Sequence, residues 1–330
     1  MDLIRPLNFY LFQMKFENIS DLRVLVETAR GGSLTAAARV LEITPAAASA
    51  MLKRLEAQVG TRLFERSTRA MRLTDQGQTL LDYATRALEL LEEGASQAAS
   101  EAGALRGTVR VAAPSDLSRS LLLGWFDGFL QQHPGVHIAL SVSDRVHDVR
   151  RDAVDVALRY GALADSQLVA RPLCITRRVP CAAPAYLARR GAPQHPADLA
   201  RHDCLTLHIA GRREVRWHFE RATDGEAVSV AVEGERSVDD GAIAHEWALA
   251  GGGIVYKSAI DVRANLRAGA LVALMPDWLG QRYALHAVLP SNRFVPARVR
   301  ALVDHLAQCC AALAAEESAQ SGGAGWVALP

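Results

Sequence analysis

The chain has 330 residues, half of them hydrophobic and 22% charged, which is typical of a globular protein with a substantial core and leaves room for about two domains. The formal net charge is +1, so no overall positive field points to nucleic acid. No stretch approaches the roughly 20 uninterrupted apolar residues of a membrane span, and the N-terminus lacks a signal-peptide cleavage site. We therefore expect a cytoplasmic protein.

The five cysteines show no spacing typical of a metal or redox site. None forms a C-x-x-C pair, and the adjacent Cys309 and Cys310 are poorly placed to bridge each other. We expect reduced, buried thiols, and neither a metal ion nor a cofactor. A redox switch that uses Cys174, Cys181 or Cys204 is the alternative.

Periodicity and composition divide the chain into five segments. An N-terminal extension, residues 1–14, precedes the first helical pattern near Met14. A run of short helices (15–74) and a long helix with a glycine-containing hinge (75–105) follow. An alternation of strands and helices (106–315) and a loose tail (316–330) complete the chain. We expect the extension to be disordered or to lie before the true start of the protein.

The long helix has a heptad pattern. Apolar residues recur at spacings of 3 and 4, at Leu81, Ala84, Leu88, Leu91, Ala95 and Ala98. This pattern favours a helix that joins two copies of the chain. The alternative is an amphipathic helix that lies on its own domain.

The part from residue 106 onward reads as an α/β domain. The expected strands cover residues 108–114, 136–142, 154–160, 204–209, 227–234, 253–256 and 284–289. Strands that alternate with helices favour a largely parallel sheet. About 210 residues are many for one open sheet, so we expect two lobes with a ligand cleft beyond the carboxyl ends of the strands.

The segment "SLTAAARVLEITPAAASAMLKRLE" predicts two short helices, 33–41 and 45–59, that meet at a corner. Ser33 is a natural N-cap of the first helix, and Thr44 is one of the second. Pro45 then stands at the first helical position, where its missing N–H costs nothing. Two short helices joined in this way form a helix-turn-helix.

The second helix has two different faces. Its predicted buried side carries Ala48, Met51, Leu52, Leu55 and Val59, and its opposite side carries Ala46, Ser49, Ala50, Lys53 and Ala57, with Arg54 near the edge. A slim face with a few cations suits a helix that lies deep in the major groove of DNA. The alternative is a helical corner inside a bundle.

The following segment favours DNA binding. "TRLFERSTRAMRLTDQG" contains two β-compatible runs around a short turn, which predicts a hairpin wing tipped by Arg66, Thr68 and Arg69. Arginine is attracted to narrow minor grooves, and contacts to phosphates set the register of a protein on DNA.

The stretch from "GGSLTAAARVLEI" to "RLTDQG" resembles the LysR-type transcriptional regulators. It keeps the order and spacing of the family's residues, and the long helix, hinge and α/β domain agree over about residues 15–310. The resemblance implies an α plus α/β fold: an N-terminal winged helix-turn-helix, a linker helix, and a two-lobed effector domain like that of periplasmic binding proteins. It also implies homodimers, usually assembled as tetramers, that bind promoter DNA and respond to a small-molecule effector; RNA polymerase is a further candidate partner.

By this resemblance the DNA-binding residues are Ser33, Thr35, Thr44, Pro45, Ala46, Ser49, Lys53, Arg54, Arg66, Thr68 and Arg69. Pro45 departs from the family, in which many members have glutamine there, and Ala48 and Ala50 are smaller than usual. These departures affect the operator sequence rather than DNA binding itself.

By the same analogy the effector-binding residues are Ser115, Ser143, Arg159, His208, Asp239 and Asp240. We expect Ser115 or Asp116 to cap the helix that begins there. Ser115 at this helix N-terminus, with Arg159 nearby, would suit an anionic ligand such as a carboxylate. Asp239 and Asp240 point instead to amine or hydroxyl groups, or serve as helix N-caps. His208 is either a ligand contact or a packed histidine.

Two other classes of protein compete with a regulator. For an enzyme, the sequence offers no nucleophile elbow, zinc spacing or phosphate loop, and the glycines at 251–253 precede a strand instead of following one. A solute-binding protein would fit the α/β part but would not need residues 15–74. We therefore expect a non-enzymatic DNA-binding regulator whose operator and effector the sequence leaves open.

Overall fold

The computed structural model describes residues 17–66, 71–99, 105–144, 154–161, 169–209, 211–289, 295–321 and 327–329. The chain divides into two compact units, residues 1–103 and 104–330. The boundary falls in the glycine-containing segment that the sequence suggested as a hinge. The predicted N-terminal extension lies outside the described residues.

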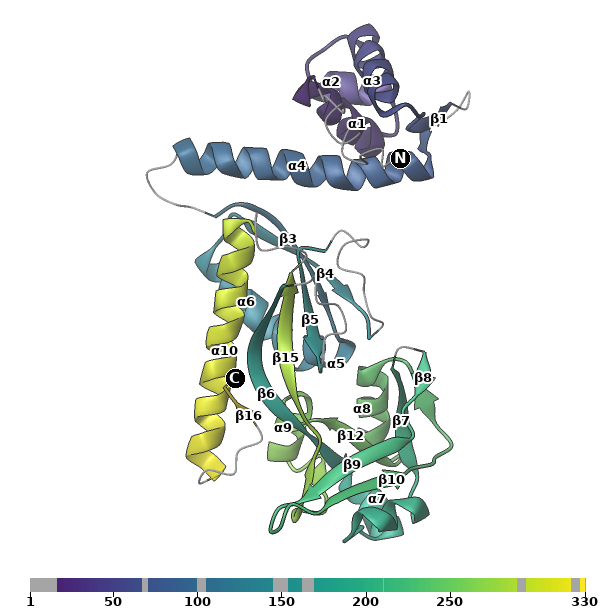
Figure 1. Ribbon diagram of the computed structural model, residues 1–330, viewed down its shortest axis with the longest axis vertical. Helices are drawn as coiled ribbons and strands as arrows, with labels where there is room; N and C mark the ends of the chain where they lie inside the picture. Colours follow the sequence, from purple (N-terminus) through teal and green to yellow (C-terminus); the bar gives the residue numbers. More distant parts are fainter. Residues whose placement is uncertain are drawn as a thin grey trace, which may run out of the picture. The chain divides into compact units, whose positions relative to one another are not determined.

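The first unit is a helical domain with a two-stranded hairpin (Figure 1). Its elements are α1 (Ile19–Gly31), α2 (Leu34–Val40), α3 (Pro45–Val59), β1 (Phe64–Arg66), β2 (Met71–Leu73) and α4 (Asp75–Ala99). The hairpin strands pair antiparallel. This arrangement confirms the predicted winged helix-turn-helix.

Side-chain caps set the corner between α2 and α3. Ser33 accepts a hydrogen bond from the backbone N–H of Ala36 at 3.1 Å, and Thr44 accepts one from Ala47 at 3.1 Å. Pro45 occupies the first turn of α3, where its missing N–H would have had no partner within the helix. The proline therefore starts a helix and does not interrupt one.

The first part of the predicted heptad seam holds α4 to its own unit. Ala84 is 2% exposed and Leu88 is 7% exposed, and both belong to the core that contains Leu25 and Leu55. Leu91, the next seam residue, is 52% exposed. The seam is therefore not one continuous surface, because its first half packs inside the domain.

The second unit is built on a long mixed sheet. In spatial order its strands are β11 (Ser237–Val238), β7 (Cys204–Ile209), β12 (Ile254–Ser258), β6 (Val169–Ala182), β15 (Arg282–Leu289), β5 (Val156–Tyr160), β3 (Gly107–Ala113) and β4 (Val136–Val142). Shorter strands attach to it: β8 (Arg212–Arg213), β13 (Val272–Ala273) and β16 (Val327–Ala328). A separate small sheet contains β10 (Ala227–Ala231), β9 (Arg216–Arg221) and β14 (Trp278–Gly280).

Helices cover this sheet. A continuous helical run comprises α5 (Ser115–Leu117), a π-helical turn η2 (Ser118–Leu122) and α6 (Leu123–Gln132). The others are α7 (Pro184–Arg190), the short η3 (Pro196–Arg201), α8 (Gly241–Leu249), α9 (Ala259–Arg267) and α10 (Ala297–Ser321).

β6 and β15 correct the expectation of a largely parallel sheet. β3 pairs in parallel with β4 and β5, and β12 does so with β7. However, β15 runs antiparallel to both β5 and β6, and β12 runs antiparallel to β6. The long β6 extends through both lobes (Figure 1). The sequence did not predict it, because Pro172, Pro180 and the arginine pair 177–178 interrupt its apolar pattern.

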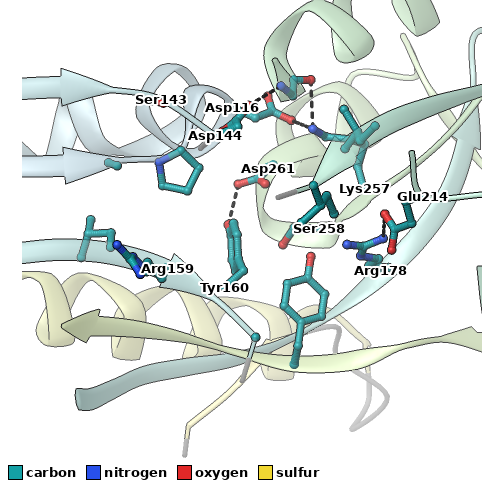
Figure 2. A pocket seen from close by; sticks show the side chains of 18 of the residues that line it. Asp116, Ser143, Asp144, Arg159, Tyr160, Arg178, Glu214, Lys257, Ser258 and Asp261 are labelled. Atoms are coloured by element: carbon teal, nitrogen blue, oxygen red, sulfur yellow. Dashed lines mark hydrogen bonds and ion pairs between the residues drawn. The ribbon is translucent and has the colours of Figure 1, made fainter. Parts of the chain in front are cut away.

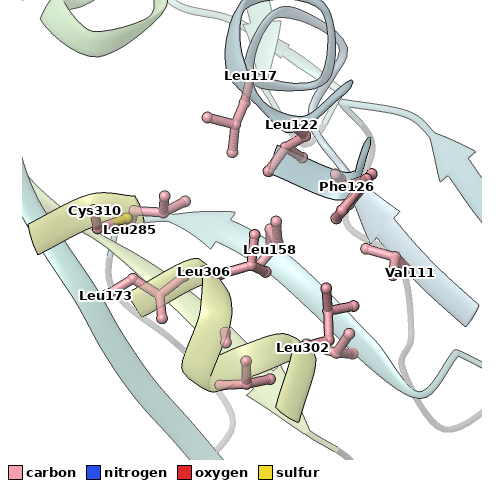
Figure 3. Packing of buried hydrophobic residues seen from close by; sticks show 14 of the residues in the cluster. Val111, Leu117, Leu122, Phe126, Leu158, Leu173, Leu285, Leu302, Leu306 and Cys310 are labelled. Atoms are coloured by element: carbon pink, nitrogen blue, oxygen red, sulfur yellow. The ribbon is translucent and has the colours of Figure 1, made fainter. Parts of the chain in front are cut away.

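Each lobe has its own core. In the first lobe, Val111 and Leu158 of the sheet belong to the same buried cluster as Leu302 and Leu306 of α10 (Figure 3). In the second lobe, Val255 of β12 belongs to a cluster with side chains of α8 and α9. Full burial of one such large aliphatic side chain stabilises the fold by roughly 1.5–3 kcal/mol, so each lobe is stabilised by a core of its own.

The expectation of a loose tail after residue 315 is wrong for its described part. α10 continues to residue 321, and Glu316 and Glu317 form ion pairs with Arg263 at 2.5 and 2.6 Å. Val327 is buried in the first-lobe core and pairs with β6. The polar composition suggested a free tail, but its carboxylates are matched by a cation on α9.

Candidate functional site

The exposed side of α3 is as slim as the sequence predicted. Ala48, Leu52 and Leu55 are buried. Ala46 and Lys53 are exposed on the opposite side of the helix, together with Thr44, Pro45 and Ala50, and Ser49 is half-buried. Thr35 on α2 is also exposed, whereas Ser33 is half-buried. An open helix face with small side chains allows the close approach that a major groove requires.

Arg54 has a role within the domain. Its guanidinium donates two hydrogen bonds to the carboxylate of Asp21 on α1, at 2.7 and 2.6 Å. Asp21 is fully buried, and its hydrogen bond raises the pKa of Arg54. Two of the nitrogen atoms expected to reach a phosphate are thus already used to attach α3 to α1. This contact fixes the orientation of the predicted recognition helix.

The wing is anchored to the start of α4. Thr74 donates its hydroxyl proton to the carbonyl of Arg62 at 2.9 Å. A Cβ atom at Gly77 would lie 2.0 Å from the carbonyl oxygen of Leu63, so only glycine allows this close packing. Arg66 ends β1, and the predicted tip residues Thr68 and Arg69 lie outside the described residues.

A cavity of about 350 Å³ lies between the two lobes of the second unit (Figure 2). We call it the inter-lobe cavity. Four predicted effector-binding residues line it: Ser143, Arg159, His208 and Asp239. Ser143 and Asp239 follow β4 and β11, and Arg159 and His208 are the next-to-last residues of β5 and β7. All four therefore lie near the carboxyl ends of strands, where ligands bind in open α/β sheets.

The other two predicted residues are used by the scaffold. Asp240 is the N-cap of α8 and accepts hydrogen bonds from the N–H groups of Ala242 and Ile243, at 2.9 and 3.1 Å. Ser115 is 1% exposed and follows the true cap position of α5, which Pro114 occupies without a side-chain bond. Neither Asp240 nor Ser115 is part of the cavity lining. The expected capping by Ser115 or Asp116 is therefore wrong.

A buried ionic cluster at one side of the cavity was not predicted. Lys257 lies 2.6 Å from one carboxylate oxygen of Asp116, and Nδ1 of His245 lies 2.9 Å from the other. Burial acts to raise the pKa of Asp116, but the attraction of Lys257 and His245 outweighs it and holds this pKa below its usual value. Because Asp116 and His245 come from different lobes, the cluster joins them. The signal in the sequence was a lysine at the end of an apolar strand.

A second ion pair and an aromatic group form another part of the lining. Arg178 donates to Glu214 at 2.6 Å, and its guanidinium lies 5.4 Å from the ring centre of Tyr256 and 5.6 Å from that of Tyr283. A partly buried cation gains from both contacts.

Asp261 is a buried acid in the lining with no cation in direct contact among the described residues. It accepts a hydrogen bond from the hydroxyl of Tyr160 at 2.8 Å. Burial, with repulsion from Asp116 as the next cause, raises the pKa of Asp261 to about 8. The carboxyl group is therefore mainly neutral at pH 7, and in that form it is able to donate a hydrogen bond to a ligand as well as accept one.

The cysteines do not support the redox alternative. Cys174, Cys181, Cys204 and Cys310 are buried, and Cys310 lies in the first-lobe core (Figure 3). Burial raises the pKa of Cys181 and that of Cys204 to about 12. A thiol at such a pKa does not form the thiolate that reacts with oxidants at neutral pH.

A metal site and a membrane-spanning helix are both absent from the described part of the chain. No cluster of three or more histidine, cysteine, aspartate or glutamate side chains is arranged to hold a metal ion there. Within the same residues, no helix is long and apolar enough to cross a lipid bilayer.

A winged helix-turn-helix joined to a two-lobed domain with a cavity between its lobes defines a DNA-binding regulator that senses a ligand. Comparison with known families agrees. Residues 19–78 match the bacterial regulatory helix-turn-helix protein family of LysR type, and residues 102–311 match the LysR substrate binding domain.

Relatives and solved structures match over most of the chain. The regulator PtxR of Pseudomonas aeruginosa is 32% identical, with 88% of this chain and 92% of PtxR covered. The activator TtdR of Escherichia coli is 30% identical, with 88% and 93% covered. The structure of CrgA, a LysR-type regulator from Neisseria meningitidis, is similar with a TM-score of 0.57 at 28% identity, over 88% of this chain and 98% of CrgA.

The chain belongs to the LysR family. It is a transcriptional regulator with a helix-turn-helix domain for DNA and an effector-binding domain, and it is not an enzyme.

Proposed function

We propose that the chain reads promoter DNA in the cytoplasm with the N-terminal half of α3 in the major groove and the wing against the backbone or minor groove. The observation that carries this proposal is the composition of the exposed face of α3. It offers Thr44, Ser49 and Lys53 as polar groups among alanines, and no large side chain keeps the helix away from base edges. Ser49 would read bases, and Lys53 would contact a phosphate.

The second part of the proposal is a homodimer formed through the exposed apolar side chains of α4, which assembles further into a tetramer. Tyr83 is 60% exposed, Leu90 is 40% exposed and Leu91 is 52% exposed. A second α4 that covers these side chains would remove them from water and place two recognition helices on one DNA site. RNA polymerase is the next partner to test, since it binds at the same promoters.

The third part is a small-molecule effector in the inter-lobe cavity. The cavity volume of about 350 Å³ is within the range of small-molecule sites. A ligand that binds differently to two arrangements of the lobes would shift the population between them, and the linker helix would transmit the change to the DNA-binding unit.

In vitro selection of binding sites from random duplexes tests base reading by α3. We expect Ser49→Ala to loosen base preference more than it weakens total affinity, because it removes a base contact and leaves the phosphate contacts in place. Ser229→Ala is a matched control, because Ser229 is exposed on β10 in the other unit. If Ser49→Ala selects the same site as the unaltered protein, base reading by Ser49 is excluded.

A further inference from the structure

One position between the lobes has the features of an anion site and is occupied by the chain itself. The carboxylate of Asp144, two residues after β4, accepts hydrogen bonds from the backbone N–H of Ser115 at 2.8 Å and from its hydroxyl at 2.6 Å. The same carboxylate accepts a third hydrogen bond from the backbone N–H of Gly241. Ser115 begins α5, in the first lobe, and Gly241 begins α8, in the second.

The donors at this position are fixed and buried. Ser115 is 1% exposed, and its hydroxyl also accepts a hydrogen bond from the N–H of Ala242 at 3.1 Å, so it is held from both sides. The first N–H groups of a helix have no partner within the helix and carry partial positive charge. Two helix starts and a buried hydroxyl therefore surround one carboxylate.

The cations described nearby are also matched by the chain's own acids. Lys257 pairs with Asp116 and donates to the carbonyl of Gly241 at 3.0 Å. Arg178 pairs with Glu214. The charged acids exceed the cations among the described lining residues even without the neutral Asp261: Asp116, Asp144, Glu214 and Asp239 against Arg159, Arg178 and Lys257. An added carboxylate would thus enter a site whose strongest anion-binding groups are already engaged.

We infer that Asp144 is a specificity-determining residue of the inter-lobe cavity. Its carboxylate fills the anion position shared by α5 and α8, so the cavity selects neutral or cationic effectors with amine or hydroxyl groups and excludes carboxylic acids. This inference rests on the proposed function of the cavity as an effector site. It decides between the two ligand chemistries that the sequence left open.

The lining offers suitable partners for such a ligand. Asp239 and Asp144 supply carboxylate acceptors, and the rings of Tyr160, Tyr256 and Tyr283 supply aromatic surface. An amine or ammonium group gains from a carboxylate and from the face of an aromatic ring. The hydroxyl of a neutral ligand finds the same acceptors.

The test is to empty the position and measure which ions enter. Benzoate and benzylamine are probes of similar shape and opposite charge, and calorimetric titration gives their affinities for the full-length protein. Asp144→Ala leaves the N–H groups of α5 and α8 without their carboxylate. We expect its affinity for benzoate to rise by about tenfold or more, the equivalent of one charge-assisted hydrogen bond, while the unaltered protein favours benzylamine over benzoate.

Asp239→Ala is the matched control. It removes one acid from the same lining but none of the donors between the helix starts, so we expect a clearly smaller gain in affinity for benzoate. Equal gains in benzoate affinity in the two variants would mean that any loss of negative charge from the lining has this effect, and would overturn the inference. Tight benzoate binding by the unaltered protein, for which Arg159 is the cation at hand, would overturn it as well.

The inference is testable even if Asp144→Ala does not fold. Formate is small enough to take the place of the missing carboxylate, so refolding in sodium formate is expected to restore the cooperative thermal transition, and sodium chloride at equal ionic strength is not. Absence of rescue by formate would contradict an anion position. Binding of a DNA duplex by the same samples, measured without added ligand, tests DNA binding separately, so a failure of the ligand inference is distinguishable from a failure of DNA binding.

Discussion

The raised pKa of Asp261 makes a quantitative prediction about the pH dependence of stability. An acid whose pKa is higher in the folded state favours folding when it is protonated. Its contribution is complete below its unfolded pKa, near 3.9, and is lost as the pH rises toward the folded value of about 8. The perturbation that removes this effect is Asp261→Asn, which keeps an oxygen to accept the hydrogen bond from Tyr160.

The magnitude follows from the two pKa values. Each pH unit corresponds to 1.36 kcal/mol. At pH 7, about three units above its unfolded pKa, keeping Asp261 protonated in the fold therefore costs about 4 kcal/mol of folding free energy. Relative to the unaltered protein, Asp261→Asn is expected to gain about 1.4 kcal/mol for each pH unit between pH 5 and 7. The comparison of two proteins at each pH cancels the other titrating groups.

Urea unfolding followed by tryptophan fluorescence measures this difference. All five tryptophans lie in the second unit, after residue 104, so the signal reports on the unit that contains Asp261. Asp277→Asn, at an exposed position of the same unit, is the control and is expected to show no such slope. If the difference in unfolding free energy between Asp261→Asn and the unaltered protein does not change with pH, Asp261 is not a neutral, buried acid in the folded state.

Three further predictions concern the first unit. Arg54→Ala is expected to lower the thermal stability of this unit by leaving the buried carboxylate of Asp21 without its cation, and Asp21→Asn in the same chain is expected to restore part of the loss. Circular dichroism melting measures both variants, and losses of stability that simply add in the double variant would argue against the ion pair. Arg69→Ala is expected to weaken binding to every DNA sequence and to reduce the slope of log affinity against log salt by about 0.9, so identical slopes would remove Arg69 from the phosphate contacts. Leu91→Glu is expected to dissociate the dimer in analytical ultracentrifugation, because it places a charge on the proposed α4 contact; an unchanged mass would show that the chain assembles elsewhere.

Local signals in the sequence were sufficient for the helix-turn-helix. The caps at Ser33 and Thr44 and the position of Pro45 act within one turn of each helix, so they fix the start of α2 and α3 without help from distant residues. The slim face of α3 also follows from spacing alone.

Long-range pairing was beyond the sequence. Nothing local shows that Arg54 reaches Asp21, 33 residues earlier, or that Lys257 meets Asp116 from the other lobe. The antiparallel strand β6 was hidden because its prolines and its arginine pair break the apolar pattern by which a strand is recognised, and nothing local shows that Arg178 lines the cavity. The positions of the strand ends were enough to predict that Ser143 and Asp239 line the cavity. They did not show that the carboxylate of Asp144 binds to the chain's own helix starts.

Genomic footprinting in the native cell shows directly whether the first unit binds promoters as part of a symmetric regulator. We expect discrete protected sites upstream of genes, each with two related half-sites whose centres are separated by about 10 base pairs or a multiple of that spacing. Protection is expected to be weaker in cells that carry Lys53→Ala. Uniform coverage of the genome, or protected sites that are unchanged by Lys53→Ala and lack paired half-sites, would contradict promoter binding of this kind.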